Sequence, residues 1–311
     1  MGYFTANWGY PWVAVVTLLV VAVHEKGLRS LNRRSTRAHA RRRRRRLWLS
    51  YGGLAVLALS VVSPLQYWAM QYFWVHMLQH ISVMLAAPAL YVAGAPLVPL
   101  IHSVPLNARR RMLRRVFVRP GRHPLRRICA AIVSPFVGIV FFNVVMVVWM
   151  LPSIFNPVMA RPELHIGLML STFFLSGLLF WVQFIQSAPL TPKLTPFAQA
   201  GALLVTNLIM TIIAVTLSLL VAVPSYHFGL MMMGSMTMRT TTLNPMADQQ
   251  IGAAILWVCG DLWCFPALVV AFRQAMKDDS ETGLMDRIIR GRRSITAEEF
   301  QKARSASRSL E

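Results

Sequence analysis

The sequence predicts an all-α fold, a bundle of seven transmembrane helices with its N-terminus outside the membrane and its C-terminus in the cytoplasm. Three observations lead there. Of the 311 residues, 56% are hydrophobic and only 14% are charged, whereas a soluble domain usually carries about 25% charge. The mean hydropathy is +0.51. The apolar residues form long runs, and the basic residues gather in blocks between them.

The predicted spans are apolar runs near the roughly 20 residues that a helix needs to cross a bilayer. They cover residues 10–24, 47–64, 73–93, 128–150, 165–186, 197–222 and 249–272. The first is short, and Trp8, Tyr10 and Trp12 around its start suit a membrane interface. No basic residue precedes it, unlike in a typical signal peptide. Residues 1–272 therefore form one transmembrane domain in this prediction.

Lysine and arginine orient the predicted bundle. Thirty of the 32 lie on one side, in residues 25–46, 94–127, 187–196 and 273–311, and two lie on the other, Arg161 and Arg239. Cytoplasmic loops carry the excess of basic residues, so the first group is assigned to the cytoplasm. The run Arg41 to Arg46 and the net charge of +21 then indicate contact with anionic membrane lipids rather than with nucleic acid.

The basic tail, residues 273–311, is predicted to be cytoplasmic. Thr296 and Glu299 form a capping-box pattern, which predicts a short helix near 297–308. The three cysteines, Cys129, Cys259 and Cys264, lie in apolar segments. They are too few for a disulfide framework, and we interpret them as small buried hydrophobic residues.

Histidines and methionines gather on the predicted outer side. His76 and His80 are four residues apart, so on a helix they share one face and can hold one metal ion. Met84 continues that face by one turn. His165 opens the fifth span, with Met169 one turn deeper, and offers a third ligand. The alternative for each histidine is an ordinary polar residue at the membrane interface.

A methionine-rich loop precedes the last span. His227 is followed by Met231, Met232, Met233, Met236 and Met238. Thioethers are soft, neutral ligands that select Cu(I) over hard ions. The alternative is an apolar loop that lies on the bilayer surface, since methionine fills irregular surfaces without any metal.

Two acids belong to the last span. Asp248 stands at its outer start, where an acid favours the helix dipole and where it could also orient a histidine from behind. Asp261 lies thirteen residues later, about 20 Å deeper at 1.5 Å per residue. Acids at such depth are functional candidates, although Asn143 or Asn207 could bind Asp261 for structural reasons alone.

Several of these motifs resemble the multispanning CtaG family of caa3-type cytochrome c oxidase assembly proteins over about residues 50–272. The similar stretches are His76-Met77-Leu78-Gln79-His80, Ala87-Pro88, Gly94-Ala95-Pro96-Leu97, His165 with Gly177-Leu178-Leu179-Phe180-Trp181, and Asp248-Gln249-Gln250-Ile251-Gly252-Ala253 with Trp257 and Gly260-Asp261. The resemblance implies a non-enzymatic role in maturing a haem–copper oxidase in a bacterial plasma membrane, with support for a copper centre.

The chain departs from the family pattern in the fifth span. There we expect a second histidine or an acid shortly after His165, but Leu168 and Met169 occupy that place. This departure favours a softer site of histidine and methionine. The methionine-rich loop is not a hallmark of the family, so its predicted copper role rests on ligand chemistry alone.

The leading hypothesis is an assembly factor that takes Cu(I) from an extracytoplasmic donor and passes it to an oxidase subunit. His76, His80 and His165 would form the site, Met77, Met84 and Met169 would line it, and the methionine-rich loop would receive or hand on the ion. Three alternatives stay open: a scaffold without metal, a haem-bearing redox subunit that uses His80 and His165 as axial ligands, and a copper transporter with Asp261 on its path.

Overall fold

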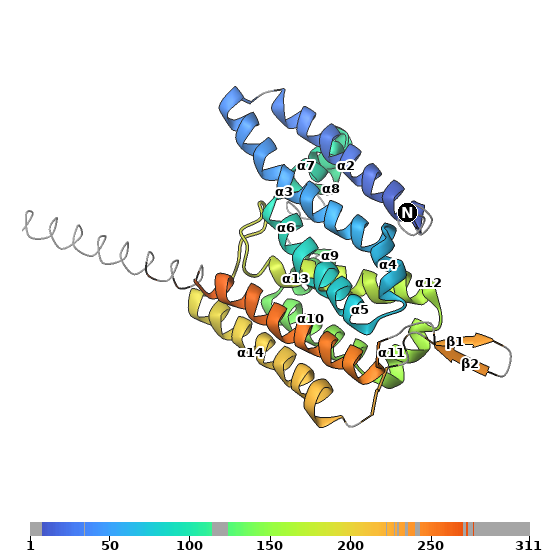
Figure 1. Cartoon of the computed structure of the whole chain (residues 1–311). Coiled ribbons are helices and arrows are strands. Elements are labelled where there is room, and N and C mark those ends of the chain that lie inside the picture. Colours follow the sequence, from blue (N-terminus) through green and yellow to red (C-terminus); the bar gives the residue numbers. More distant parts are fainter. Residues whose placement is uncertain are drawn as a thin grey trace, which may run out of the picture.

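The computed structural model describes residues 8–269 apart from 34, 114–123, 222, 227, 229, 234–235 and 240–242, and also residues 272 and 276. Long helices dominate this part of the chain (Figure 1). Their bounds, with three π-helical turns (η) and two strands, are α2 Pro11–Asn32, α3 Arg37–Val62, α4 Pro64–Ala69, α5 Phe73–Ile81, η1 Ser82–Ala86, α6 Ala87–Ala93, α7 Leu97–Ser103, α8 Leu106–Leu113, α9 Pro124–Ile132, α10 Pro135–Trp149, α11 Pro152–Met159, α12 Pro162–Leu164, η3 His165–Leu170, α13 Ser171–Trp181, α14 Pro196–Val215, η4 Thr216–Leu220, β1 Leu230–Met233 and β2 Met236–Arg239. A last helix follows, Pro245–Val269.

Six of the seven predicted spans are present as helices long and apolar enough to cross a membrane. They run over Pro11–Asn32, Arg37–Val62, Phe73–Ala93, Pro162–Trp181, Pro196–Leu220 and Pro245–Val269. The second begins ten residues before its predicted start, because the run Arg41 to Arg46 continues the helix. The predicted tail helix near 297–308 lies outside the described residues.

The fourth predicted span, 128–150, is not one straight helix. The chain breaks after α9 at Val133 and Ser134, and Pro135 begins α10, whose first turn is capped by the Ser134 hydroxyl accepting from the Val137 amide at 3.3 Å. With 15 residues, α10 is about 22 Å long, which is short of the bilayer core. Pro152 then begins α11, which bends away by 72°. The described residues therefore include six helices long and apolar enough to cross a membrane, or seven if this bent pair is counted as one span.

The segments that the sequence prediction assigns to the two sides of the membrane lie at opposite ends of the bundle. Figure 1 shows the start of α2, α4, α11, α12 and the hairpin of β1 and β2 at one end. The turn between α2 and α3, the start of α14 and the end of the last helix lie at the other. The described segments that the sequence prediction assigns to opposite sides thus lie at opposite ends of the helices. Which end faces the cytoplasm stays a prediction from the basic residues.

Two glycines let three helices approach closely around the centre of the bundle. A Cβ on Gly177 of α13 would collide with the Met84 carbonyl oxygen and would lie 2.7 Å from Pro88 Cγ. A Cβ on Gly53 of α3 would lie 2.5 Å from the Ala87 carbonyl oxygen. Small residues at such crossings are typical of membrane helices. The segment of η1 and α6 is therefore held tightly between α3 and α13.

The methionine-rich loop adds a feature to the predicted all-α fold. Within the described residues, β1 and β2 pair as an antiparallel hairpin, with Met231 opposite Met238 and Met233 opposite Met236. The rest of the described structure is helical apart from turns and loops, so the helical class is confirmed for the membrane part of the chain.

Candidate metal centre

Three histidines from two helices meet inside the bundle. His76 and His80 lie on consecutive turns of α5, and His165 is the first residue of η3. Each offers one ring nitrogen, and these three atoms all lie within 4.8 Å of one another. The ring centroid of His76 lies 4.1 Å from that of His80 and 4.9 Å from that of His165. All three side chains are at most 1% exposed.

π-helical turns adjoin the three histidines in both helices. η1 begins two residues after His80, and η3 begins at His165 itself. A π turn inserts an extra residue and changes where the following side chains point, and such turns are frequent at functional sites. The two helices thus share a local irregularity at the depth where the histidines converge.

Four ring nitrogens of this trio are buried without a hydrogen-bond partner among the described residues. They are Nε2 of His76, both Nδ1 and Nε2 of His80, and Nε2 of His165. A buried polar atom without a partner typically costs 1–3 kcal/mol, so a cluster of four is unusual. A bound cation would take one nitrogen from each ring and so satisfy three of the four.

His76 is oriented by the turn before its own helix. Its Nδ1 lies 3.2 Å from the carbonyl oxygen of Ala69, the last residue of α4. The carbonyl can only accept, so Nδ1 carries the proton and Nε2 presents a lone pair. In metal sites, a hydrogen bond from the ring nitrogen that does not bind the metal usually fixes the orientation of the imidazole.

Two buried glutamines support the trio from the side of α3 and α4. Gln79 Nε2 donates to the Ser60 carbonyl at 2.6 Å and to Gln66 Oε1 at 2.5 Å. Gln66 Nε2 in turn lies 3.4 Å from Nδ1 of His165. Gln79 belongs to the motif His76 to His80, but no role was predicted for either glutamine. Gln79 lies inside a predicted span and Gln66 lies two residues after the end of another, and mainly apolar residues surround both amides in the sequence.

Asp248 holds the helix that carries His76 and His80, rather than a histidine side chain. Its carboxylate oxygens accept from the backbone amides of Phe73 at 2.8 Å and Trp74 at 3.0 Å. These amides open α5, where the helix leaves its first N–H groups unpaired and favours a negative charge. The last helix is thereby fixed to the start of α5, three residues before His76.

Aromatic rings close the site. Phe155 of α11 lies 5.1 Å from the His76 ring and 6.4 Å from the His80 ring. Phe228 lies 5.4 Å from His76, and Phe173 lies 4.6 Å from His80. Tyr226 stacks nearby on Phe73 and packs against Phe155, and its hydroxyl donates to the Met150 carbonyl at 2.7 Å. The trio is therefore enclosed mainly by apolar side chains.

The predicted methionine ligands fall into two groups. Met77, Met84 and Met169 are buried in the same core as the aromatic rings, and Met77 packs towards Gly252 of the last helix. Met231, Met232, Met233, Met236 and Met238 lie on the hairpin strands. His227 lies outside the described residues. Histidine donors are thus gathered at one point, whereas the hairpin methionines belong to a separate element.

Asp261 is not part of this cluster. Its Oδ1 accepts from Asn207 Nδ2 at 2.9 Å. Asn143, the other partner that the sequence offered, donates to Thr206 Oγ1 at 3.1 Å instead. Asp261 therefore has a structural partner on α14.

The arrangement suits a small cation better than a haem. The donors are three neutral imidazoles, and within the described part of the chain no carboxylate or thiolate joins the group. Imidazole binds borderline and soft ions such as copper. A porphyrin would need a slot next to His80, where Phe155 and Phe173 already pack.

Comparison with known proteins identifies a family. The family model described as cytochrome c oxidase caa3 assembly factor matches residues 25–278. No curated protein and no solved structure matches the chain.

Proposed function

Because the chain belongs to the family of cytochrome c oxidase caa3 assembly factors, we propose that it binds copper at the outer face of the bacterial plasma membrane and helps to form a copper centre of such an oxidase. The observation that carries this proposal is the trio His76, His80 and His165, with four unpartnered ring nitrogens. Copper is cargo in this role, and the family suggests a non-catalytic protein.

The proposed ion is Cu(I). Burying a charge in a low-dielectric interior is costly, and the cost grows with the charge of the ion. With three neutral donors and no acid in the described cluster, a monovalent ion leaves less charge uncompensated than a divalent one. Buried Met84 and Met169 on the same two helices add to the soft character that favours Cu(I).

The route of the ion is proposed from the order of the elements. The methionine-rich hairpin and the segment of Tyr226 and Phe228 come just before the last helix, and Phe228 packs on His76. Copper from an extracytoplasmic donor would meet the hairpin first and the histidines second. From there it would pass to an oxidase subunit, which requires ligands that exchange readily.

The test is a count of bound metal. The full chain is purified in mild detergent, loaded with Cu(I) without oxygen and freed of excess ion. We expect about one copper ion per chain, held by the imidazole donors, and none above background in His76→Ala/His80→Ala. The matched control is His24→Ala, which removes a histidine that is equally buried but binds the Val20 carbonyl.

The outcomes separate the proposals. Retention of copper by the double variant would exclude this site. Background copper in the parent as well would favour the scaffold without metal. Loss of copper in the double variant but not in His24→Ala, together with lower oxidase copper content in cells, supports delivery.

A further inference from the structure

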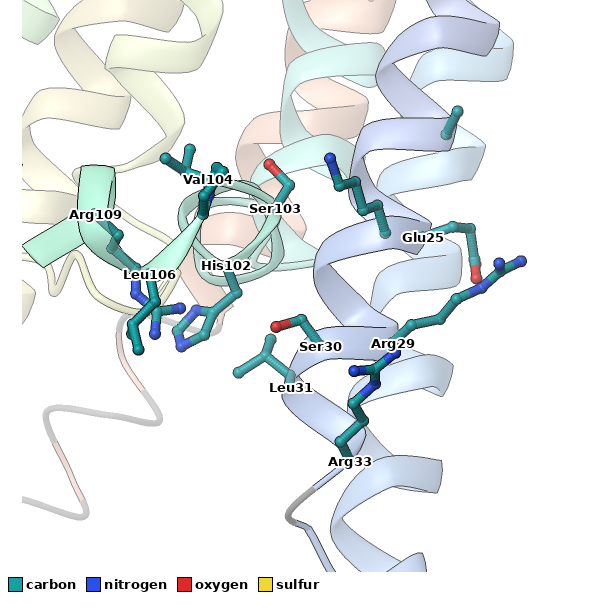
Figure 2. Close-up of a pocket in the computed structure, with 13 residues that line it drawn as sticks. Glu25, Arg29, Ser30, Leu31, Arg33, His102, Ser103, Val104, Leu106 and Arg109 are labelled. Atoms are coloured by element: carbon teal, nitrogen blue, oxygen red, sulfur yellow. The ribbon is translucent and has the colours of Figure 1, made fainter.

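A second site lies away from the histidines, beside the part of α2 that follows its apolar stretch. It is a pocket of about 980 Å³ between α2 and the corner of α7 and α8. Figure 2 shows His102 and Arg109 on one wall and Ser30 and Leu31 of α2 on the other. The two walls are held together where Gly27 packs directly against the backbone of Pro99.

The pocket is strongly cationic. Lys26, Arg29, Arg33 and Arg109 line it, with Glu25 as its acid. Glu25 is already engaged, since its Oε1 accepts from the Tyr51 hydroxyl at 2.9 Å and lies 3.4 Å from Arg44 Nη2. Among the described residues none of the four cations has an ion-pair partner. Arginine binds phosphate through two parallel hydrogen bonds, and lysine as a point charge.

The cations continue an exposed apolar stripe of α2. Val15, Leu18 and Ala22 are exposed at intervals of three and four residues, and Lys26, Arg29 and Arg33 follow at the same intervals. The opposite side, with His24, Gly27 and Leu28, is buried. One face of α2 is therefore apolar up to Ala22 and then carries three positive charges. The stretch from Ala22 to Arg33 is about 16 Å long.

We propose that this pocket binds the phosphate of an anionic lipid headgroup, with the acyl chains lying along Val15, Leu18 and Ala22. Ser30 and Ser103 supply hydrogen-bonding hydroxyls at the wall of the pocket. A soluble phosphate would satisfy the cations but would not use the apolar half of the stripe. The two-walled shape distinguishes the site from the arginines of α3, where Arg37, Arg41, Arg42 and Arg45 line a hollow on one helix.

The experiment measures retained lipid. The full chain is stripped of lipid in mild detergent, mixed with phosphatidylglycerol or with phosphatidylcholine of the same acyl chains, and examined by native mass spectrometry. We expect a phosphatidylglycerol adduct and little phosphatidylcholine. In Lys26→Gln/Arg33→Gln/Arg109→Gln the affinity should fall about a hundredfold, since each of the three basic residues near an anionic surface contributes roughly fivefold.

The control triple Arg41→Gln/Arg42→Gln/Arg45→Gln removes the same charge from α3 and should keep the adduct. Equal loss in both triples would show general charge attraction and would overturn the pocket. Displacement of the lipid by millimolar inorganic phosphate would show a site for a soluble anion and would overturn the lipid assignment. Unchanged helix content and elution volume of both triples check that the variants are folded.

Discussion

The histidine end of the bundle, with the trio of His76, His80 and His165, differs from the arginine end, with the turn between α2 and α3, in how its polar groups are held. At the histidine end the donors are neutral and buried, and Gln66, Gln79 and Asp248 hold them from several elements. At the arginine end the charges are exposed, and most need no fixed partner because water and headgroups solvate them. A buried site of neutral donors must therefore be built by packing, whereas an exposed cationic site can be built from one helix face and a neighbouring corner.

The largest expected effect comes from removing an aromatic ring that closes the histidine end. Phe155→Ala removes a fully buried ring that touches both His76 and His80, and we expect a loss of about 3–5 kcal/mol in the free energy of unfolding. Water should then reach the imidazoles, which faster modification by diethylpyrocarbonate would report. The control Phe197→Ala changes a phenylalanine that is 73% exposed and should shift stability by less than about 0.5 kcal/mol. Equal behaviour of the two variants would contradict a closed site.

A second prediction compares the two acids of the last helix. Asp248→Ala leaves the Phe73 and Trp74 amides without their acceptor, so stability should fall by about 1–3 kcal/mol and Cu(I) affinity by about tenfold. Asp248→Asn keeps one acceptor and should lose less. Asp261→Ala breaks the bond to Asn207 far from the trio and should leave Cu(I) affinity unchanged in a competition titration. Equal weakening by both acids would show that Asp248 has no particular link to the site.

The smallest expected effect concerns Tyr226, which lies between two spans. Tyr226→Phe loses the hydrogen bond to Met150, worth about 1 kcal/mol at neutral pH. Burial raises the pKa of Tyr226 above its ordinary value of 10.0. The unfolded chain thus ionises this phenol first, so its contribution to stability is complete below about pH 10 and declines above it. Unfolding followed across this range should show a steeper decline in the parent than in Tyr226→Phe; identical slopes would mean that the phenol is not buried.

The features that depend on local sequence pattern could be predicted. Apolar length located six spans, and helical spacing put His76 and His80 on one face of α5. The meeting of His165 with that face followed from sorting the histidines by side. These inferences needed only periodicity, length and charge.

Contacts between distant segments could not be read in this way. Nothing local to Asp248 indicates that it caps a helix 175 residues earlier, and the link from Gln66 to His165 spans 99 residues. The break of the fourth span could have been predicted from local signals, because Ser134-Pro135 and Pro152 are typical of helix starts. The π turns beside His80 and His165 are local irregularities that no periodicity in the sequence encodes.

The most direct measurement is copper K-edge X-ray absorption on the Cu(I)-loaded full chain, beside His165→Ala. The account predicts nitrogen neighbours with the outer-shell scattering of imidazole rings, and fewer such rings in the variant. A spectrum of sulfur neighbours alone, unchanged by His165→Ala, would place copper on the methionines and contradict the histidine centre.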